Sequence, residues 1–316
     1  MEKGRVCVTG AGGFIGSWLV KLLLSKGYVV HGTLREPSDQ KYAHLWTLDK
    51  AAENLKVFKA DLLDYQSILT ALEGCDGVFH VASPVPSSSV PNPEKELIEP
   101  AVKGTLNVLK GCSEAKVKRA IVLSSIGAIK MNPAWPKGQV KDEACWSDVE
   151  YCKKTGNWYF ASKTEAELLA LEYAEKSGLG VVTICPILVL GPVLQSTLNA
   201  SSLALIKLLK GVGSVENVEW RIVDVRDLAE ALLLVYEKPE AKGRYLCLSH
   251  AVLAQELVGK LQSMYPNYNY PKSFVEVELQ DRVMSDKLQK IGWTYRPLEE
   301  TLADSIKSYR QLGYLD

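Results

Sequence analysis

A tyrosine, a lysine and a serine have the types and spacing that carbonyl reduction requires. Tyr159 and Lys163 stand four residues apart in NWYFASKTEAE, so both side chains leave one face of a predicted helix. A phenol with an ordinary pKa of about 10 becomes useful near neutral pH when an ammonium favours the phenolate, and Lys163 supplies that charge. Ser125 ends a predicted strand in IVLSSIGA, where its hydroxyl could hold a substrate oxygen beside Tyr159. A lone YxxxK pair also arises by chance in helices.

A glycine-rich turn predicts where a dinucleotide binds. In VCVTGAGGFIGSWLV, Gly10, Gly13 and Gly16 follow the first predicted strand and open the first predicted helix. Such glycines permit a tight turn, a close approach of backbone to a pyrophosphate and close packing of helix on strand. The helix N-terminus then offers free N–H groups to the phosphates. An ordinary structural turn is the alternative. The side chains expected to border the same site are Thr9, Phe14 and Ile15.

The end of the second predicted strand favours NADPH over NADH. An acidic residue at this place accepts from the ribose 2′-hydroxyl of NAD and repels a 2′-phosphate. The chain carries Arg35 there, with Lys41 six residues further on, so we predict that the cofactor is NADP(H). The alternative is that Arg35 and Lys41 are a solvated loop pair.

Further residues at strand ends are predicted to contact the cofactor. Asp61 follows the third strand and could bond the adenine amino group, although an Asp at this place is as often a helix N-cap. Ala82 is expected to pass under the adenosine; the alternative is that it is small for packing reasons. The full set of additional predicted contacts is Asp61, Leu62, Val81, Ala82, Ser83, Ser124, Lys163, Pro186 and Leu188.

Repeated strand–helix units are expected to position these residues. Short β-branched runs at 5–9, 28–34, 55–59, 77–81, 119–124 and 180–185 alternate with segments of helical period at 14–25, 94–112 and 158–176. This alternation predicts an α/β fold with a Rossmann-type, doubly wound parallel sheet. Proline-rich or aromatic stretches at 84–93 and 130–151 are expected to form long loops at the sheet edge.

The alternation weakens after Pro192 into predicted helices at 201–210, 227–237, 255–264 and 298–312, with a strand at 243–249. We therefore expect residues 1–191 to form an NADP-binding domain and 192–316 to form mainly a smaller, mixed α/β substrate lobe. Segments near 220–250 are candidates for returning to the main domain.

Composition narrows the class of protein. The chain has 316 residues, 47% hydrophobic and 23% charged, which is typical of a globular protein rather than a disordered or coiled-coil one. Lys+Arg and Asp+Glu both number 37, so no basic surplus favours nucleic acid. The longest apolar run, 181–190, is shorter than the roughly 20 residues that span a bilayer. A first strand at Arg5 leaves no room for a secretory signal, so we expect a cytoplasmic protein without a membrane segment or an evident obligate protein partner.

Metal chemistry and disulfides are not expected. The 7 cysteines lack any CxxC pair, and the 4 histidines lack zinc-ligand spacing. The cysteines are expected to be mostly buried small hydrophobic residues, and the chemistry is expected to depend on organic groups.

Taken together, TGxxGxxG, a strand-end serine and YxxxK in this order resemble the extended short-chain dehydrogenases/reductases. PAVKGTLNVL, ICPILVLGP and VDVRDLA also match, so the resemblance covers essentially the whole chain. It implies an enzyme in which NADPH delivers hydride to a carbonyl carbon and Tyr159 protonates the oxygen. It further implies that Ser125 hydrogen-bonds this oxygen, while Lys163 lowers the tyrosine pKa and holds the nicotinamide ribose.

Within this group the chain is similar to plant cinnamoyl-CoA reductases, short-chain cinnamyl alcohol dehydrogenases and, further off, dihydroflavonol reductases. The matching stretches are GCDGVFHVASPV, SSIGAIKMNP, DEACWSDVEYCKKTGNWY, LVLGPVLQSTLNAS and KGRYLC. The resemblance implies a phenylpropanoid thioester or aldehyde substrate, and hence a place in lignin biosynthesis.

Departures from the reductase pattern guide the choice of substrate. NWYFASK stands where the family has NWYCYGK, so Phe160 replaces a cysteine and a regulatory disulfide with Cys152 is not expected. The resemblance places Ala204, Lys207 and Ala254 where a His, a Lys and an Arg grip the CoA phosphates. Since only the lysine remains, we favour reduction of a hydroxycinnamaldehyde to its alcohol, at about 1.5 to 3 kcal/mol per lost charged hydrogen bond. The alternatives are a cinnamoyl-CoA reductase, a dihydroflavonol-type ketone reductase, a nucleotide-sugar epimerase and a non-catalytic NADP-binding regulator.

An aromatic substrate needs apolar walls near the nicotinamide. Core packing explains Ile187 and Leu188 equally well, whereas a tryptophan in a polar loop is less readily explained as core. The predicted substrate-binding residues are Ile126, Trp135, Ile187, Val193 and Lys207.

Overall fold

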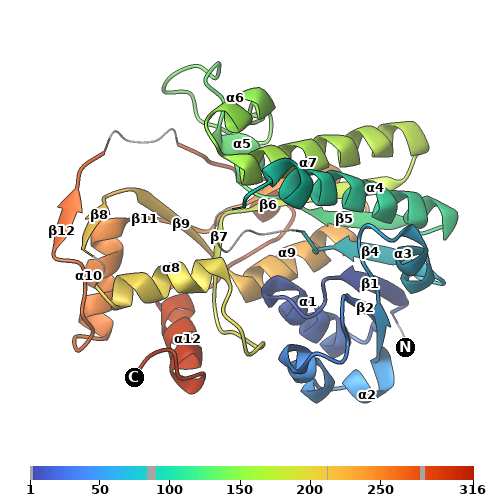
Figure 1. The fold of residues 1–316 in the computed structure, drawn as a ribbon, viewed down its shortest axis with the longest axis horizontal. Helices are drawn as coiled ribbons and strands as arrows, with labels where there is room; N and C mark the ends of the chain where they lie inside the picture. The colour runs from blue at the N-terminus through green and yellow to red at the C-terminus, as the bar shows by residue number, and fades with distance from the viewer. Residues whose placement is uncertain (1–2, 84–89, 212, 278–281) are drawn as a thin grey trace.

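Seven parallel strands form the main sheet of the protein, as seen in a computed structural model that describes residues 3–83, 90–211, 213–277 and 282–316. The order is β10-β6-β5-β4-β1-β2-β3 (Figure 1). The chain runs outward from β1 in both directions, so the order of connection reverses between β1 and β4, where open α/β sheets bind ligands. The strands are β1 (Arg5–Thr9), β2 (Val29–Leu34), β3 (Leu55–Lys59), β4 (Gly77–His80), β5 (Arg119–Leu123), β6 (Gly180–Pro186) and β10 (Gly243–Cys247).

Alternate residues of each strand enter two separate cores. Val6 and Val8 of β1 join a cluster with leucines of α1 and α9, whereas Cys7 faces a cluster that includes Ile68 of α3 and Val108 of α4. Strands buried on both faces read as continuous apolar runs, which explains RVCVT. The covering helices are α1 (Phe14–Ser25) and α9 (Val225–Glu237) on one face, and α3 (Tyr65–Leu72), α4 (Glu99–Glu114) and α7 (Trp158–Ser177) on the other.

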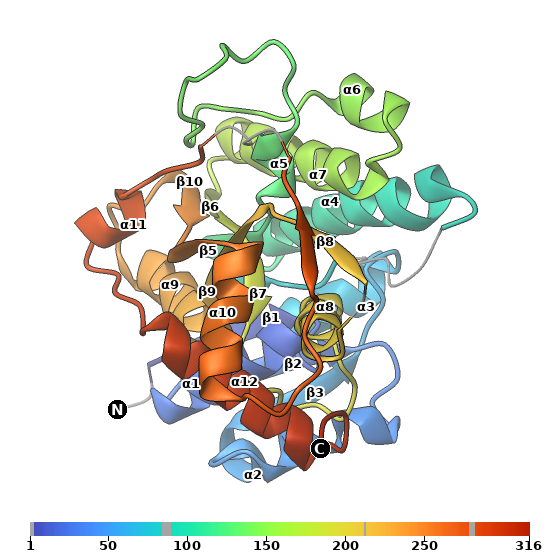
Figure 2. The ribbon, with the colours of Figure 1, turned by 90° about the vertical axis from the view of Figure 1, so that its left-hand side faces the viewer.

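A second core lies beside the main sheet, on the left of Figure 1 and toward the viewer in Figure 2. A three-stranded sheet, β11-β9-β7, and a two-stranded sheet, β12-β8, pack there with three helices. These elements are β7 (Leu188–Leu190), α8 (Ala200–Leu209), β8 (Ser214–Glu216), β9 (Glu219–Asp224), β11 (His250–Leu253), α10 (Ala254–Met264), β12 (Ser273–Val275) and α12 (Leu298–Gln311).

The doubly wound sheet confirms the predicted fold class, and its strands lie within a few residues of their predicted positions. The predicted loop at 130–151 begins within α5 and ends within α6, and residues 84–89 of the other predicted loop lie outside the described part. Both α9 and β10 belong to the main layer. The domain boundary at residue 191 stays a prediction. The short remaining elements are η1 (Gln40–Thr47), α2 (Ala51–Asn54), η2 (Glu94–Ile98), α5 (Gly127–Lys130), α6 (Val149–Lys154) and α11 (Lys287–Lys290).

Candidate active site

The three predicted catalytic residues meet where β5 ends against α7. The Tyr159 hydroxyl hydrogen-bonds Ser125, whose Oγ also accepts from the Gly127 amide at 3.1 Å. The Lys163 ammonium donates to the carbonyl oxygen of Leu123, the last residue of β5, at 3.2 Å. Successive turns of α7 therefore contact Ser125 and Leu123 at the end of β5, and the structure brings the phenol, the ammonium and the hydroxyl to this strand end.

Burial sets the charge state of this site. Lys163 is only 5% exposed, and burial lowers its pKa to about 8, against the opposing effects of Cys185 and Glu167. Burial raises the pKa of Tyr159, and the hydrogen bond with Ser125 opposes that rise. The sequence predicts that Lys163 lowers the tyrosine pKa; its ammonium donates to the Leu123 carbonyl here, and its effect on the phenol stays a prediction.

A buried histidine lies behind the lysine. His80 ends β4, and its ring contacts the hydroxyls of Thr9 at 2.9 Å and Thr105 at 3.2 Å. Burial, together with the positive charge of Lys163, lowers the His80 pKa to about 3. The ring is therefore neutral at physiological pH, and it joins β1, β4 and α4 without serving as an acid or base.

Two glycines leave the space that a dinucleotide needs. Gly10 has φ +69, a conformation that L side chains rarely adopt, and an added Cβ would lie 3.0 Å from Ala82. A Cβ on Gly16 would lie 2.2 Å from the Gly10 carbonyl oxygen, so only glycine lets α1 pack this closely on the turn. Gly13 caps α1 without a side chain, leaving the helix N-terminus open to an anion. These residues fit a pyrophosphate.

The two basic residues predicted to select NADPH differ in their surroundings. Arg35 is exposed directly after β2, and no hydrogen bond or ion pair to it is found in the described part of the chain. Lys41, in contrast, forms an ion pair with Asp39 at 2.6 Å, which raises the Lys41 pKa, and lies over the Tyr42 ring at 4.9 Å. Arg35 is thus the better placed of the two to take a phosphate.

The hydroxyls of Thr9 and Ser124, two of the predicted cofactor residues, bond to partners inside the protein. Thr9 Oγ1 accepts from the amides of Val81 and Ala82, both at 3.1 Å, in addition to its contact with His80. Ser124 Oγ donates to the Glu167 carboxylate at 2.6 Å inside the protein. Both side chains are buried, and the contact of these two residues with the cofactor stays a prediction.

The other predicted cofactor residues lie at or near the carboxyl edge of the sheet. Asp61 is exposed and accepts from the Leu63 amide at 2.8 Å, whereas the N-cap of α3 is Asp64. The Leu62 carbonyl accepts from Asn107 at 2.8 Å. Those that remain partly exposed at this edge are Ile15, Val81, Ala82, Ser83 and Leu188, while Phe14 and Pro186 are buried.

The predicted substrate walls divide between core and edge. Ile187 is 7% exposed and belongs to the main core, whereas Ile126 and Val193 are half-buried at its margin. Trp135 packs against the cluster of Ile129, Cys145, Cys185, Leu246 and Val283, so the loop tryptophan does have a core contact. Its buried indole N–H has no hydrogen-bond acceptor among the described residues. Lys207 is exposed on α8.

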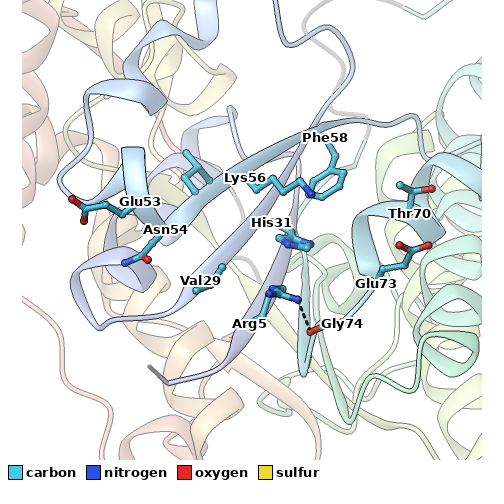
Figure 3. Close-up of a pocket in the computed structure, with 11 residues that line it drawn as sticks. Arg5, Val29, His31, Glu53, Asn54, Lys56, Phe58, Thr70, Glu73 and Gly74 are labelled. Carbon is cyan, nitrogen blue, oxygen red and sulfur yellow. Dashed lines mark hydrogen bonds between the residues drawn. The ribbon is translucent and has the colours of Figure 1, made fainter. Parts of the chain in front are cut away.

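The protein has one cavity beside a predicted substrate residue and another at the opposite edge of the sheet. One of about 450 Å³ borders Ile187 and lobe residues including Arg221, His250 and Tyr295. A cavity of about 600 Å³ lies at the amino ends of β1, β2 and β3, where Arg5 donates to the Gly74 carbonyl (Figure 3). The larger cavity is on the opposite edge of the sheet from Tyr159 and Lys163, so it is not the place of catalysis.

Other predicted absences concern metals, membranes and disulfides. Within the described ranges, no group of three or more His, Cys, Asp or Glu could hold a metal ion, and no helix is long and apolar enough to cross a membrane. All seven cysteines lie within the described ranges and are buried, in agreement with the expectation for most of them.

Comparison with known proteins assigns the chain to a protein family. A model of the NAD dependent epimerase/dehydratase family matches residues 6–247. Cinnamoyl-CoA reductase 1 of Petunia hybrida is 46% identical over 98% of this chain and 93% of its own.

Solved structures share the whole fold. Vestitone reductase from alfalfa superposes with a TM-score of 0.85 and 33% identity, over 99% of this chain and 100% of its own. Gre2 from Candida albicans in complex with NADPH superposes with a TM-score of 0.84 and 27% identity, over 98% of this chain and 99% of its own. The predicted resemblance to extended short-chain reductases is confirmed.

Proposed function

The chain belongs to the NAD dependent epimerase/dehydratase family, and from that premise we propose that it reduces the thioester carbonyl of a phenylpropanoid-CoA with NADPH, releasing the aldehyde. It is an oxidoreductase that uses a nicotinamide cofactor. The observation that carries the proposal is the meeting of Tyr159, Lys163 and Ser125 at the end of β5, on the same carboxyl edge of the sheet as the glycine turn after β1.

Each residue has one task in this reaction. The glycine turn would hold NADPH, which when bound would supply the hydride for the carbonyl carbon. Ser125 Oγ donates a hydrogen bond to the carbonyl oxygen, and the Tyr159 hydroxyl delivers a proton to it. Lys163 keeps a positive charge beside the phenol that has lost its proton. Loss of the thiol from the reduced carbon then gives the aldehyde, so one hydride and one proton are consumed for each aldehyde and thiol formed.

The thioester is better supported than the aldehyde that the sequence favoured. The petunia relative is named a cinnamoyl-CoA reductase and resembles this chain over nearly its whole length. Ala254, taken from the sequence as a missing phosphate anchor, is fully buried at the start of α10 and does not line a ligand surface. Its identity therefore carries no information about CoA.

Reduction of a hydroxycinnamaldehyde to its alcohol is the second candidate. The observation in its favour is that Ala204 leaves Lys207 as the one basic group of the predicted phosphate anchors on α8. A direct test follows NADPH oxidation with feruloyl-CoA, coniferaldehyde and a dihydroflavonol under identical conditions. Faster turnover of feruloyl-CoA supports the proposal, and faster turnover of coniferaldehyde replaces it with the second candidate.

The choice of NADPH over NADH is supported by the exposed guanidinium of Arg35 after β2. The Candida albicans neighbour is a complex with NADPH, which agrees with this choice.

The role of the phenol has its own test. Tyr159→Phe removes the proton donor and is expected to lower kcat at least 1000-fold while NADPH affinity stays within twofold, measured by fluorescence titration. The matched control is Tyr173→Phe on the same helix, whose hydroxyl contacts Ser113 at 2.9 Å away from the site. A phenylalanine variant at 159 with wild-type turnover would exclude this mechanism.

A further inference from the structure

A buried ion pair lies directly beneath the catalytic residues. Glu167 is one helical turn beyond Lys163 on α7, and its side chain is fully buried. Arg244 on β10 donates to its carboxylate through Nε at 2.8 Å and through Nη2 at 3.3 Å. The Arg244 side chain is 6% exposed, so the pair is shielded from water.

The Glu167 carboxylate ties α7 to three neighbouring strands. It accepts from Ser124 at the end of β5 and from Thr183 of β6, both at 2.6 Å, and Cys185 contacts it at 3.4 Å. With Arg244 of β10, the partners come from β5, β6 and β10. Because all of them converge on one side chain, the carboxylate fixes both the rotation and the axial position of α7 on the sheet.

Arg244 extends the same network to the loop that covers the site. Its Nη1 donates to the carbonyls of Glu143 at 2.9 Å and Cys145 at 2.8 Å, and its guanidinium stacks on the Trp146 ring at 3.3 Å. Ser147, next along the loop, bonds the carbonyls of α5 residues Gly127 and Ala128, both at 2.8 Å.

Helix α5 begins directly after Ser125 and Ile126. The pair therefore supports Tyr159 and Lys163 through α7, and Ser125 through the loop and α5. The pair thus contacts the segments on both sides of the reacting groups, α7 and the loop before α6, but does not contact these groups themselves.

We propose that Glu167 and Arg244 are a positioning pair, which holds the Tyr159 hydroxyl and the Lys163 ammonium at the end of β5 in the geometry that carbonyl reduction needs. Replacing a buried ion pair by uncharged residues of similar size is often neutral or stabilising, so stability alone does not account for the two charges here. Catalytic groups need placement within about 0.5 Å, and a misplacement of about 1 Å can cost a factor of about 100 in rate. The role in turnover rests on the proposed function.

The experiment compares variants of the whole protein. Glu167→Gln alone leaves the Arg244 charge buried without a counter-ion, and is expected to destabilise the protein strongly. The double variant Glu167→Gln/Arg244→Met removes both charges and keeps the side-chain volumes. Thr183→Val removes one donor to Glu167 with little change of shape, and decides the question if the double variant does not fold. The matched control is Glu172→Gln on the same helix, where Glu172 forms an exposed pair with Lys176.

A positioning role predicts a specific pattern of results. The folded double variant is expected to keep NADPH affinity within twofold while kcat falls at least 30-fold, and Thr183→Val to lower kcat 3- to 10-fold. Glu172→Gln is expected to match the wild type. A folded double variant with kcat within twofold of the wild type overturns the proposal, as does an unaffected kcat in Thr183→Val.

A second readout needs no substrate. The tyrosinate absorbance of each variant, after subtraction of its Tyr159→Phe counterpart, reports the pKa of this phenol. If the pair positions α7, loosening it admits water and the Tyr159 pKa falls by at least half a unit. An unchanged titration in the folded double variant overturns the proposal. A wild type that reduces none of the carbonyls tested, but whose phenol still responds to the pair, rejects the proposed function and keeps the positioning role.

Discussion

The buried charge of Lys163 is expected to lower the free energy of unfolding, and the variant Lys163→Met measures the size of this effect. Burial lowers the pKa of this ammonium from 10.5 to about 8, so keeping it charged at pH 7 costs about 3 kcal/mol, at about 1.4 kcal/mol for each pH unit. Methionine fills a similar volume without charge, but it leaves the Leu123 carbonyl without its donor, which costs about 1 kcal/mol. The variant should therefore be about 2 kcal/mol more stable at pH 7 and inactive as a reductase.

The sign of the pH dependence follows from proton binding. Between pH 8 and about 10.5 the unfolded chain keeps the Lys163 proton while the folded protein has lost it, so wild-type stability rises with pH across this window. The advantage of Lys163→Met is then fully present below pH 8, reaches zero near pH 10, and gives way at higher pH to the cost of about 1 kcal/mol for the lost donor to Leu123.

Urea unfolding of the cofactor-free proteins at pH 6, 7, 8, 9 and 10 measures this difference. The control is Lys176→Met, on the exposed part of the same helix, which should change stability by no more than about 0.5 kcal/mol at any pH. If Lys163→Met is less stable than the wild type at pH 7, or if its advantage does not vary with pH, the assignment of Lys163 as a costly buried cation is wrong.

Three further changes test the cofactor and substrate sites. Arg35→Ala should raise the KM for NADPH about 10- to 100-fold and leave the KM for NADH within twofold, because only NADPH has the 2′-phosphate that accepts a charged hydrogen bond. The control is Lys59→Ala, which breaks an exposed ion pair with Glu36. Equal losses of affinity for both cofactors would contradict the assignment of Arg35. Gly16→Ala should weaken NADPH binding in a fluorescence titration and lower Tm, since the added Cβ would lie 2.2 Å from the Gly10 oxygen. The control is Gly259→Ala, in open space on α10, which should leave stability unchanged or raise it. A Gly16→Ala variant that binds NADPH like the wild type would refute the role of the glycine turn in binding. Trp135→Phe removes a buried N–H without an acceptor among the described residues, so Tm should stay the same or rise. The KM for the aromatic substrate should rise about 3- to 10-fold. An unchanged KM would show that Trp135 does not belong to the substrate site.

The residues that carry the chemistry could be predicted from sequence because their types and spacing are restrictive. Tyr159 and Lys163 share a helix face at any register, and three glycines between a strand and a helix leave few other interpretations. The lobe was less predictable. Its strands β8 and β12 have three residues each, too few for a period-two pattern to emerge, and they pair across almost sixty positions of the chain.

The electrostatic coupling within the site also lay beyond the sequence. Nothing in YxxxK indicates that the lysine ammonium also donates to a backbone carbonyl, which in the structure is that of Leu123. The pairing of Lys41 with Asp39 is similar. Asp39 is the N-cap of the short helix η1 and pairs with Lys41, whereas no hydrogen bond or ion pair to Arg35 is found among the described residues.

Strand parity explains why the hydroxyls of Thr9 and Ser124 find partners inside the protein. Val6 and Val8 face one core and Cys7 the other, so Thr9 must share the side of Cys7, where α3 and α4 pack. The same parity in β5 places Ile121 and Leu123 on one face and Ala120 and Val122 on the other, which directs Ser124 toward α7. A hydroxyl buried under a helix needs an internal acceptor. The acid one turn beyond Lys163 on the face that α7 turns to the sheet is Glu167, so the buried carboxylate beneath the catalytic residues follows from strand parity and helix period together.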